Sequence, residues 1–239
     1  MRVKKYLSVR GIEFESINVV EDADGLAELR RLGARSVPVV SRGERYVFAQ
    51  VLHPVIEFLG LDDDTGPALS PAALAERLTS ALETAARLAR QMPDERLGDE
   101  LPHRPRSWRV LMHHIFQVPS AFLDMEDSSE ELTYENLVAP PPETLETSAD
   151  IAAFGEQVRE RFELWWQRVM GQPFDSEVPT YFGATSRHEM LERTVWHSMQ
   201  HMRQLASLLE QAGVIPDRPL TVSDLEGLPL TEQIWDEAP

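Results

Sequence analysis

The C-terminal two thirds of the chain repeats apolar residues at the three-to-four-residue spacing of amphipathic helices. Four stretches show this pattern, over residues 71–92, 107–125, 151–169 and 186–212. The first is opened by Ser70, a favoured N-cap residue, which Pro71 follows at the first helical position. The fourth is opened by a capping box formed by Ser186 and Glu189. Four amphipathic helices of this kind predict an all-α four-helix bundle.

Three further features of the sequence interrupt or follow the predicted helices. Pro119 lies inside the second stretch and predicts a kink or an early end, because proline lacks the N–H that an interior helix position donates. Residues 126–146 are acidic and proline-rich, and they predict a long crossover connection between the second and third helices. Residues 216–239 are acidic and irregular, and they predict an extended C-terminal tail.

The first sixty residues alternate between helical and extended patterns over shorter distances. The predicted order is helix, strand, helix, strand, strand, helix, over residues 2–10, 12–20, 24–32, 37–40, 45–48 and 51–59. The acidic, turn-rich run from Leu61 to Pro67 marks the best domain boundary. The sequence therefore predicts an α+β protein of two domains, with an α/β segment at 1–61, a helical bundle at 68–215 and the tail at 216–239.

One run in the first segment carries a family signature, GIEFESINVVEDADGLAELRRLGARSVPVVSRGERYVF. It resembles the glutaredoxin branch of the thioredoxin fold through the second strand, the second helix and the Val-Pro corner. The resemblance implies a cis peptide between Val37 and Pro38, where the backbone pairs with glutathione in that family. The chain departs from the family because it starts where the first helix is under way, without the central strand and the cysteine-bearing loop. Val37 and Pro38 are therefore expected either to dock a thiol cofactor or to belong to a remnant that supports the structure or docks a partner.

The chain contains no cysteine, which excludes disulfides, thiolate metal ligands and internal thiol redox chemistry. Any metal site must therefore use His, Asp or Glu. No apolar run is long enough to span a bilayer or to form the core of a signal peptide, so the cytoplasm is the expected compartment.

The net charge of −17 is unevenly distributed. Residues 1–60 carry nine Lys and Arg against eight Asp and Glu, whereas the remaining residues carry fourteen against thirty-two. An acidic surface repels nucleic-acid phosphates and anionic membranes. We therefore expect a small-molecule substrate, and neither nucleic acid nor membrane as a partner.

Histidines supply the candidate metal ligands. His197 and His201 lie four residues apart, so both imidazoles project from one face of the fourth predicted helix, one turn apart. That spacing suits chelation of one divalent metal, although two unconnected surface or core histidines would give the same pattern. His188 is about 180° from His197 around the helix and is expected on the surface. In the second predicted helix, His114 borders the apolar stripe and is the favoured third ligand, whereas His113 is expected to face solvent or to support the ligands.

Two runs, SWRVLMHHIFQVPSAFLD and WHSMQHMRQL, together resemble the DinB-like family of metal-binding four-helix bundles. That family takes one histidine from its second helix and a His-x-x-x-His pair from its fourth. Transferred to this chain, the implied metal ligands are His114, His197 and His201. Gln204 and Leu205 match the Gln-Leu pair that usually ends the family motif, whereas Met202 and Arg203 depart from the common Arg-Gly.

The resemblance also implies a chemistry. Three histidines leave at least one coordination position for water or substrate, as in catalytic metal sites. Zinc and nickel lead the candidate metals, with iron and manganese behind them. The DinB-like and related maleylpyruvate isomerase groups are associated with low-molecular-weight thiols, which implies a metal-dependent thiol S-transferase or hydrolase acting on a small electrophile or thiol conjugate. No residue stands out as a general base, and the pocket candidates are Gln200, Glu163, Trp166, Tyr134, Tyr181 and Arg203.

A different class of function is compatible with the same residues. A bundle of this type can serve as a non-catalytic metal-binding stress-response or interaction module, with homodimerisation through the bundle face. A redox adaptor, in which the N-terminal segment docks a partner glutaredoxin or a thiol, is the third alternative.

Overall fold

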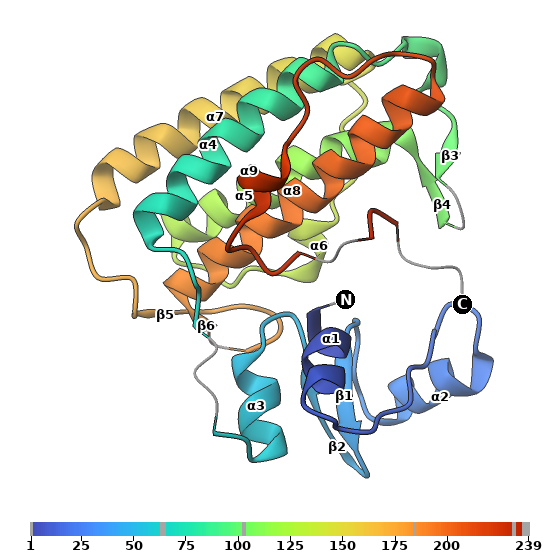
Figure 1. Ribbon diagram of the computed structural model, residues 1–239, viewed down its shortest axis with the longest axis vertical. Coiled ribbons are helices and arrows are strands. Elements are labelled where there is room, and N and C mark those ends of the chain that lie inside the picture. The colour runs from blue at the N-terminus through green and yellow to red at the C-terminus, as the bar shows by residue number, and fades with distance from the viewer. Residues whose placement is uncertain (1, 63–65, 102–103, 184, 231–232, 236–239) are drawn as a thin grey trace. The chain divides into compact units, whose positions relative to one another are not determined.

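The computed structural model describes residues 2–62, 66–101, 104–183, 185–230 and 233–235 (Figure 1). The chain divides into two compact units. Residues 67–228 form one, which we call the helical unit. Residues 1–66 and 229–239 form the other, which we call the N-terminal unit. The chain is thus a mixture of long helices and small antiparallel sheets.

Among its described residues, the N-terminal unit contains three helices and one hairpin. Its elements are α1 (Arg2–Val9), α2 (Ala23–Arg31), β1 (Val39–Arg42), β2 (Arg45–Phe48) and α3 (His53–Leu59). The strands pair antiparallel with Val39 opposite Phe48 and Arg42 opposite Arg45. Gly43 in the turn has a φ of +61°, a conformation that side-chain-bearing residues rarely adopt. Buried apolar residues from α1, α3 and the loop before α3 form the core, namely Val3, Leu7, Ala49, Leu52, Val55 and Ile56.

The strand predicted over residues 12–20 is not formed. Residues 12–18 have no regular secondary structure, and the apolar side chains of Phe14, Ile17 and Val20 are exposed. The two strands of the described N-terminal unit pair with each other, so this segment has no strand beside it to complete a ladder. The second predicted strand also starts later than expected, at Val39, because Pro38 has no N–H to donate to a neighbour.

Four long helices form the framework of the helical unit, and each begins within three residues of its predicted start. They are α4 (Pro71–Ala89), α5 (Trp108–Ser128), α7 (Ser148–Val169) and α8 (Arg187–Gln211). Helix α4 packs on α7 and α8, and α5 packs on the same two helices (Figure 1). Ser70 and Ser107 cap α4 and α5, while Ser186 and Glu189 form the predicted capping box of α8. The large apolar side chains facing inward are almost fully buried, including Phe116, Phe122, Phe162 and Trp165.

Short elements fill the connections between these helices. They are a 3-10 turn at Asp94–Arg96, β3 (Glu100–Leu101), β4 (Arg104–Ser107), α6 (Tyr134–Leu137), β5 (Glu177–Val178), β6 (Thr185–Ser186) and α9 (Val222–Leu225). The crossover segment is joined to the loop before α8, because Leu132 donates to the Pro179 carbonyl and accepts from the Tyr181 amide. This pairing places Tyr181 close to the N-terminal half of α8.

The segment after α8 is not a free tail over residues 215–223. Arg87 donates to the carbonyls of Asp217 and Arg218, and Gln91 donates to that of Ile215. Arg77 donates to the carbonyl of Ser223. Side chains of α4 therefore hold this segment through its backbone oxygens, contacts that acidic composition alone does not reveal.

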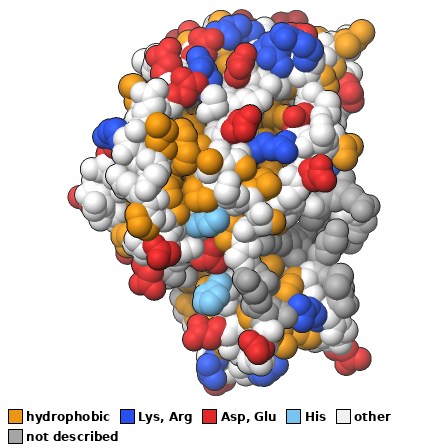
Figure 2. All heavy atoms as spheres, turned by 60° about the vertical axis from the view of Figure 1, so that its left-hand side comes forward, with side chains coloured by type: hydrophobic (Ala, Val, Ile, Leu, Met, Phe, Trp, Pro, Cys, Tyr) orange, Lys and Arg blue, Asp and Glu red, His pale blue; other side chains and the backbone are white. Residues whose placement is uncertain are grey.

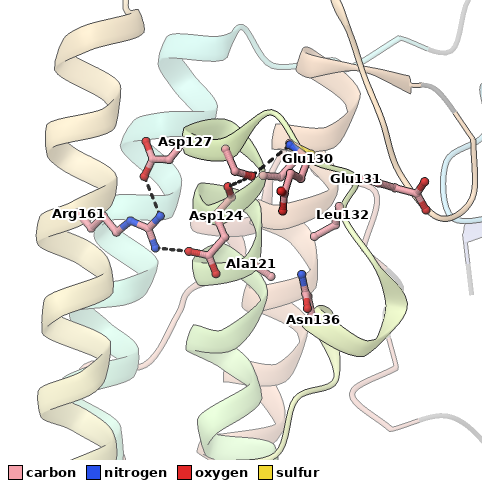
Figure 3. A pocket seen from close by; sticks show the side chains of 10 residues that line it. Ala121, Asp124, Asp127, Glu130, Glu131, Leu132, Asn136 and Arg161 are labelled. Carbon is pink, nitrogen blue, oxygen red and sulfur yellow. Dashed lines mark hydrogen bonds and ion pairs between the residues drawn. The ribbon is translucent and has the colours of Figure 1, made fainter.

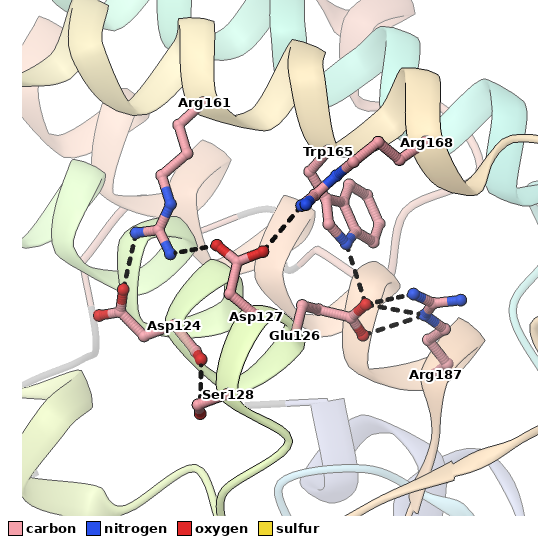
Figure 4. Close-up of polar contacts among 8 residues, drawn as sticks. All are labelled: Asp124, Glu126, Asp127, Ser128, Arg161, Trp165, Arg168 and Arg187. Carbon is pink, nitrogen blue, oxygen red and sulfur yellow. Dashed lines mark hydrogen bonds and ion pairs between the residues drawn. The ribbon is translucent and has the colours of Figure 1, made fainter.

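A buried ion pair joins the C-terminal part of α5 to the start of α8 (Figure 4). The Glu126 carboxylate, with its side chain 4% exposed, pairs with Arg187 and accepts a 2.9 Å hydrogen bond from Trp165 Nε1. Nearby on the surface, Arg161 and Arg168 both donate to Asp127. These contacts fix α5 against α7 and α8 at one end of the unit.

Acidic side chains are spread over the face shown in Figure 2 and are interspersed with Lys and Arg. Within the described residues, no helix has both the length and the apolar character needed to cross a bilayer.

Candidate metal centre

Three histidines from two adjacent helices converge at one point of the helical unit. Nε2 of His114 lies 3.2 Å from Nε2 of His197, which lies 3.1 Å from Nε2 of His201. Two nitrogens bound at about 2.0–2.1 Å to one tetrahedral zinc lie roughly 3.3 Å apart. The spacing fits three ligands of a single ion. His114, His197 and His201 are the residues assigned as ligands in the sequence, and the structure brings them together.

The short contacts between ring nitrogens are informative because each neutral imidazole has one N–H and one lone pair. Nε2 of His197 presents either an N–H or a lone pair in the ring plane, so it can satisfy only one of its two neighbours well. A divalent cation among the three nitrogens accepts all three lone pairs and removes this conflict. The donor set therefore fits a metal better than it fits a hydrogen-bonded histidine cluster.

Gln204 orients one of the ligands. Its side-chain oxygen lies 2.7 Å from Nδ1 of His201, one helical turn away on α8. An amide oxygen only accepts, so Nδ1 of His201 carries the proton and Nε2 keeps the lone pair that a metal needs. The family motif drew attention to Gln204, but its role as the hydrogen-bond acceptor behind His201 appears only in the structure.

A buried hydrogen bond next to the histidine cluster fixes how α5 and α8 are aligned along their axes. Ser198 Oγ donates to the carbonyl oxygen of Ile115 at 3.0 Å. That carbonyl would ordinarily accept from the residue four positions later, which is Pro119 and has no N–H. Because Ile115 and Ser198 adjoin His114 and His197, this bond helps to place the two imidazoles opposite each other. Helix α5 accordingly continues through Pro119 to Ser128 and does not end early.

The electrostatic surroundings keep the ligands neutral. Burial lowers the pKa of His114 and of His197 well below 6.5, and His201, Arg106 and Arg193 lower both pKa values further. Neutral imidazole is the form that binds metal. By exposure, His114 is buried whereas His197 and His201 are half-buried, so the cluster meets solvent on the α8 side.

The other candidate histidines lie outside the cluster. His113 is 2% exposed and its ring stacks on Phe154 at a centroid distance of 5.2 Å, so the expectation that it faces solvent was wrong. Burial, together with Arg109, lowers the pKa of His113 to about 4. Nε2 of His188 lies 2.8 Å from the Leu69 carbonyl oxygen, and the residue is half-buried in the first turn of α8.

Arg193 is a neighbour of the cluster that sequence reasoning missed. It lies four residues before His197 on α8 and is 3% exposed. Its guanidinium lies over the ring of Phe182, 5.4 Å from the centroid, and is hydrogen-bonded to the Tyr181 hydroxyl. The Tyr181 ring in turn contacts that of Tyr134 at 5.6 Å. The available signal was the four-residue spacing Arg193–His197–His201, which places the arginine on the ligand face.

The remaining pocket candidates have other contacts. Gln200 accepts a 2.8 Å hydrogen bond from Arg203. Glu163 accepts one from Arg159 on its own helix. Trp166 lines a surface hollow of about 320 Å³ with residues of α4. Of the two tyrosine candidates, Tyr181 is hydrogen-bonded to Arg193 and Tyr134 contacts the Tyr181 ring.

A second hollow, of about 390 Å³, lies at the C-terminal end of α5 and is rich in carboxylates (Figure 3). Arg161 spans two of them, with 2.6 Å to Asp124 and 2.7 Å to Asp127. Asp124 and Asp127 therefore have a cationic partner in Arg161, which accounts for their place beside the hollow.

In the N-terminal unit, the peptide between Val37 and Pro38 is cis, as the glutaredoxin resemblance implies. Val37 is 44% exposed, and its carbonyl accepts a 3.0 Å hydrogen bond from Gln50 Nε2. A thiol cofactor docking through this backbone would share or displace the Gln50 contact.

Comparison with known proteins supports one part of this picture. The family model of glutaredoxin matches residues 1–47, which is the part of the chain that resembles the glutaredoxin course. No curated protein matches the chain. The N-terminal unit is therefore glutaredoxin-like.

Proposed function

We propose that the helical unit is a metal-binding four-helix bundle of the DinB-like type. Its three-histidine centre would serve a thiol-dependent transferase or hydrolase acting on a small electrophile or thiol conjugate. The observation that carries the proposal is the convergence of three imidazole Nε2 atoms from two helices, with neighbouring atoms 3.1–3.2 Å apart. The two sequence runs that contain these histidines support the family assignment, and the glutaredoxin-like unit supports a connection to low-molecular-weight thiols.

His114, His197 and His201 would hold the ion, and zinc or nickel suits three imidazole ligands best. A divalent metal bound there supplies a Lewis acid that lowers the pKa of a coordinated thiol or water. Gln204 keeps His201 in the metal-binding tautomer, and the packed α5–α8 interface fixes His114 opposite His197. His197 and His201 are half-buried whereas His114 is buried, so a further ligand would approach from the side of α8.

Val37 and Pro38 of the N-terminal unit would present backbone groups to the thiol cofactor. The proposal places this chemistry in the cytoplasm, where reduced thiols are abundant.

Activity is tested with the full-length chain loaded with zinc or nickel, mixed with glutathione, mycothiol or bacillithiol and a chromogenic electrophile. The proposal predicts conjugation or hydrolysis that requires both metal and one of the thiols, and that is lost in His197→Ala. His188→Ala is the matched control, because it removes a histidine from the same helix but outside the cluster. Metal binding without turnover with any of the three thiols would favour the alternative function, a non-catalytic metal-binding module.

A further inference from the structure

Positive charge surrounds the three-histidine cluster even though the chain as a whole is strongly acidic. Arg106 from β4 and Arg193 from α8 both act electrostatically on His114 and His197. The other titratable groups that act on these two rings are the neighbouring histidines. A metal centre of three neutral imidazoles with two arginines nearby carries a large net positive charge, which favours an anion as the incoming ligand.

Arg193 is the more informative of the two arginines because it is buried. Withdrawing a guanidinium from water is costly, and buried charges are ordinarily matched by hydrogen bonds or by an opposite charge. One hydrogen-bond partner of Arg193 is the Tyr181 hydroxyl, a phenol that is neutral near pH 7 and whose pKa burial raises further. In addition, the Nε and Nη1 atoms of Arg193 are buried and have no acceptor in the structure.

We propose that Tyr181 and Arg193 form an anion subsite beside the metal centre, and that the molecule handled there carries a carboxylate. This inference rests on the proposed function and names the class of its ligand. Because the Tyr181 oxygen accepts from the guanidinium, its O–H is the group that would donate to a bound carboxylate. One guanidinium with one hydroxyl balances a single negative charge, which fits a carboxylate better than a phosphate dianion.

The spacing of Arg193 and His197 along α8 limits the distance between the thiol and the carboxylate of such a ligand. Arg193 and His197 are four residues apart, which is about 6 Å along the axis of α8. A thiol separated from its carboxylate by two or three carbons can therefore reach both the metal and the subsite. Tyr181 is half-buried whereas Arg193 is 3% exposed with its guanidinium over the Phe182 ring, so a ligand coming from solvent would meet Tyr181 before Arg193.

The test uses the full-length chain loaded with one Co²⁺, whose visible absorption reports thiolate coordination. 3-Mercaptopropionate is titrated against its neutral methyl ester, which has the same thiol but no charge. The subsite predicts that the carboxylate binds about tenfold to a hundredfold more tightly than the ester, as expected for hydrogen bonds to a charged group. In Arg193→Met this preference should fall to nearly none, whereas Arg193→Lys should keep part of it.

Two further variants keep the result interpretable. Tyr181→Phe retains the ring and removes the hydroxyl, and it should weaken carboxylate binding even if Arg193→Met fails to fold. Arg90→Met removes a surface arginine that pairs with Glu156, and it should leave the preference unchanged. Removing a cation beside the metal should also leave Co²⁺ affinity in Arg193→Met equal to or higher than in the wild type.

The possible failures are distinguishable. A chain that binds no Co²⁺ at the histidines overturns the proposed function and the anion subsite together. A chain that binds one Co²⁺ but takes up both thiols equally overturns the anion subsite alone. A preference for the carboxylate that persists in both Arg193→Met and Tyr181→Phe overturns it as well.

Discussion

The buried hydroxyl of Ser198 on α8 donates a 3.0 Å hydrogen bond to the carbonyl of Ile115 on α5. The carbonyl is available because Pro119, four residues later, cannot donate to it. The carbonyl left without its usual partner inside α5 thereby forms a bond between the two helices that carry the clustered histidines. Ser198 is 1% exposed, so water cannot easily take its place.

Ser198→Ala should therefore destabilise the chain by about 1–3 kcal/mol, the typical cost of leaving a buried polar group unsatisfied. In a Pro119→Ala background the cost should be smaller, because the alanine N–H can donate to Ile115 within the helix. Urea unfolding of the two single variants and the double variant gives the coupling between them. Additive changes in the free energy of unfolding would contradict this description of the helix junction.

Gln204 offers a test of ligand orientation without removing a ligand. Gln204→Leu deletes the acceptor of His201 Nδ1, and loss of such a partner typically lowers metal affinity about tenfold to a hundredfold. Chelator competition measures the change. Gln200→Leu is the control, since Gln200 contacts Arg203, and it should have metal affinity close to that of the wild type. Equal effects of the two variants would argue against the tautomer assignment.

His113 predicts a pH dependence of stability in the chelator-treated protein. Its pKa falls from 6.5 in the unfolded chain to about 4 in the folded one, so between these values the unfolded chain binds more protons. Stability should fall as the pH drops through this window, by an amount on the order of 3 kcal/mol from this residue. His113→Phe should reduce the difference in unfolding free energy between pH 7 and pH 4.5. An unchanged pH dependence would show that another group is responsible.

Gly155 is required by close helix packing. A Cβ at this position would lie 2.4 Å from Cε1 of Phe116, whose side chain is fully buried. Gly→Ala in a helix interior ordinarily stabilises by about 0.5–1 kcal/mol, but overpacking a core typically costs about 1–3 kcal/mol. Thermal unfolding of Gly155→Ala should therefore show a lower midpoint. Gly98→Ala, where the added Cβ meets nothing within 4 Å, should not.

Much of the helical unit follows from local signals in the sequence. Ser70 and Ser186 cap the helices that their positions predicted, because an N-cap depends on the residues of a single turn. The two histidines on one face of α8 follow from helical geometry. The choice of His114 over His113 combined its place at the edge of the apolar stripe with a family resemblance, and the structure places His114 in the cluster.

The features that were not predicted depend on contacts between distant segments. Residues 12–20 have the composition of a strand, but a strand forms only with a neighbour to pair with. The expected tail is held by Arg77, Arg87 and Gln91, which lie more than 120 positions earlier. Arg193 could be placed on the ligand face from its spacing, but its burial under Phe182 depends on a loop whose path the sequence does not reveal.

The most direct test of the metal centre is the amount of metal bound per chain. Elemental analysis of the purified full-length chain should find about one divalent ion per chain. The stoichiometry should fall to near zero in His114→Ala, His197→Ala and His201→Ala, and stay unchanged in His113→Phe and His188→Ala. A wild-type chain that neither carries nor takes up zinc, nickel, iron or manganese would contradict the central claim. Full retention of the metal in the three alanine variants would contradict it as well.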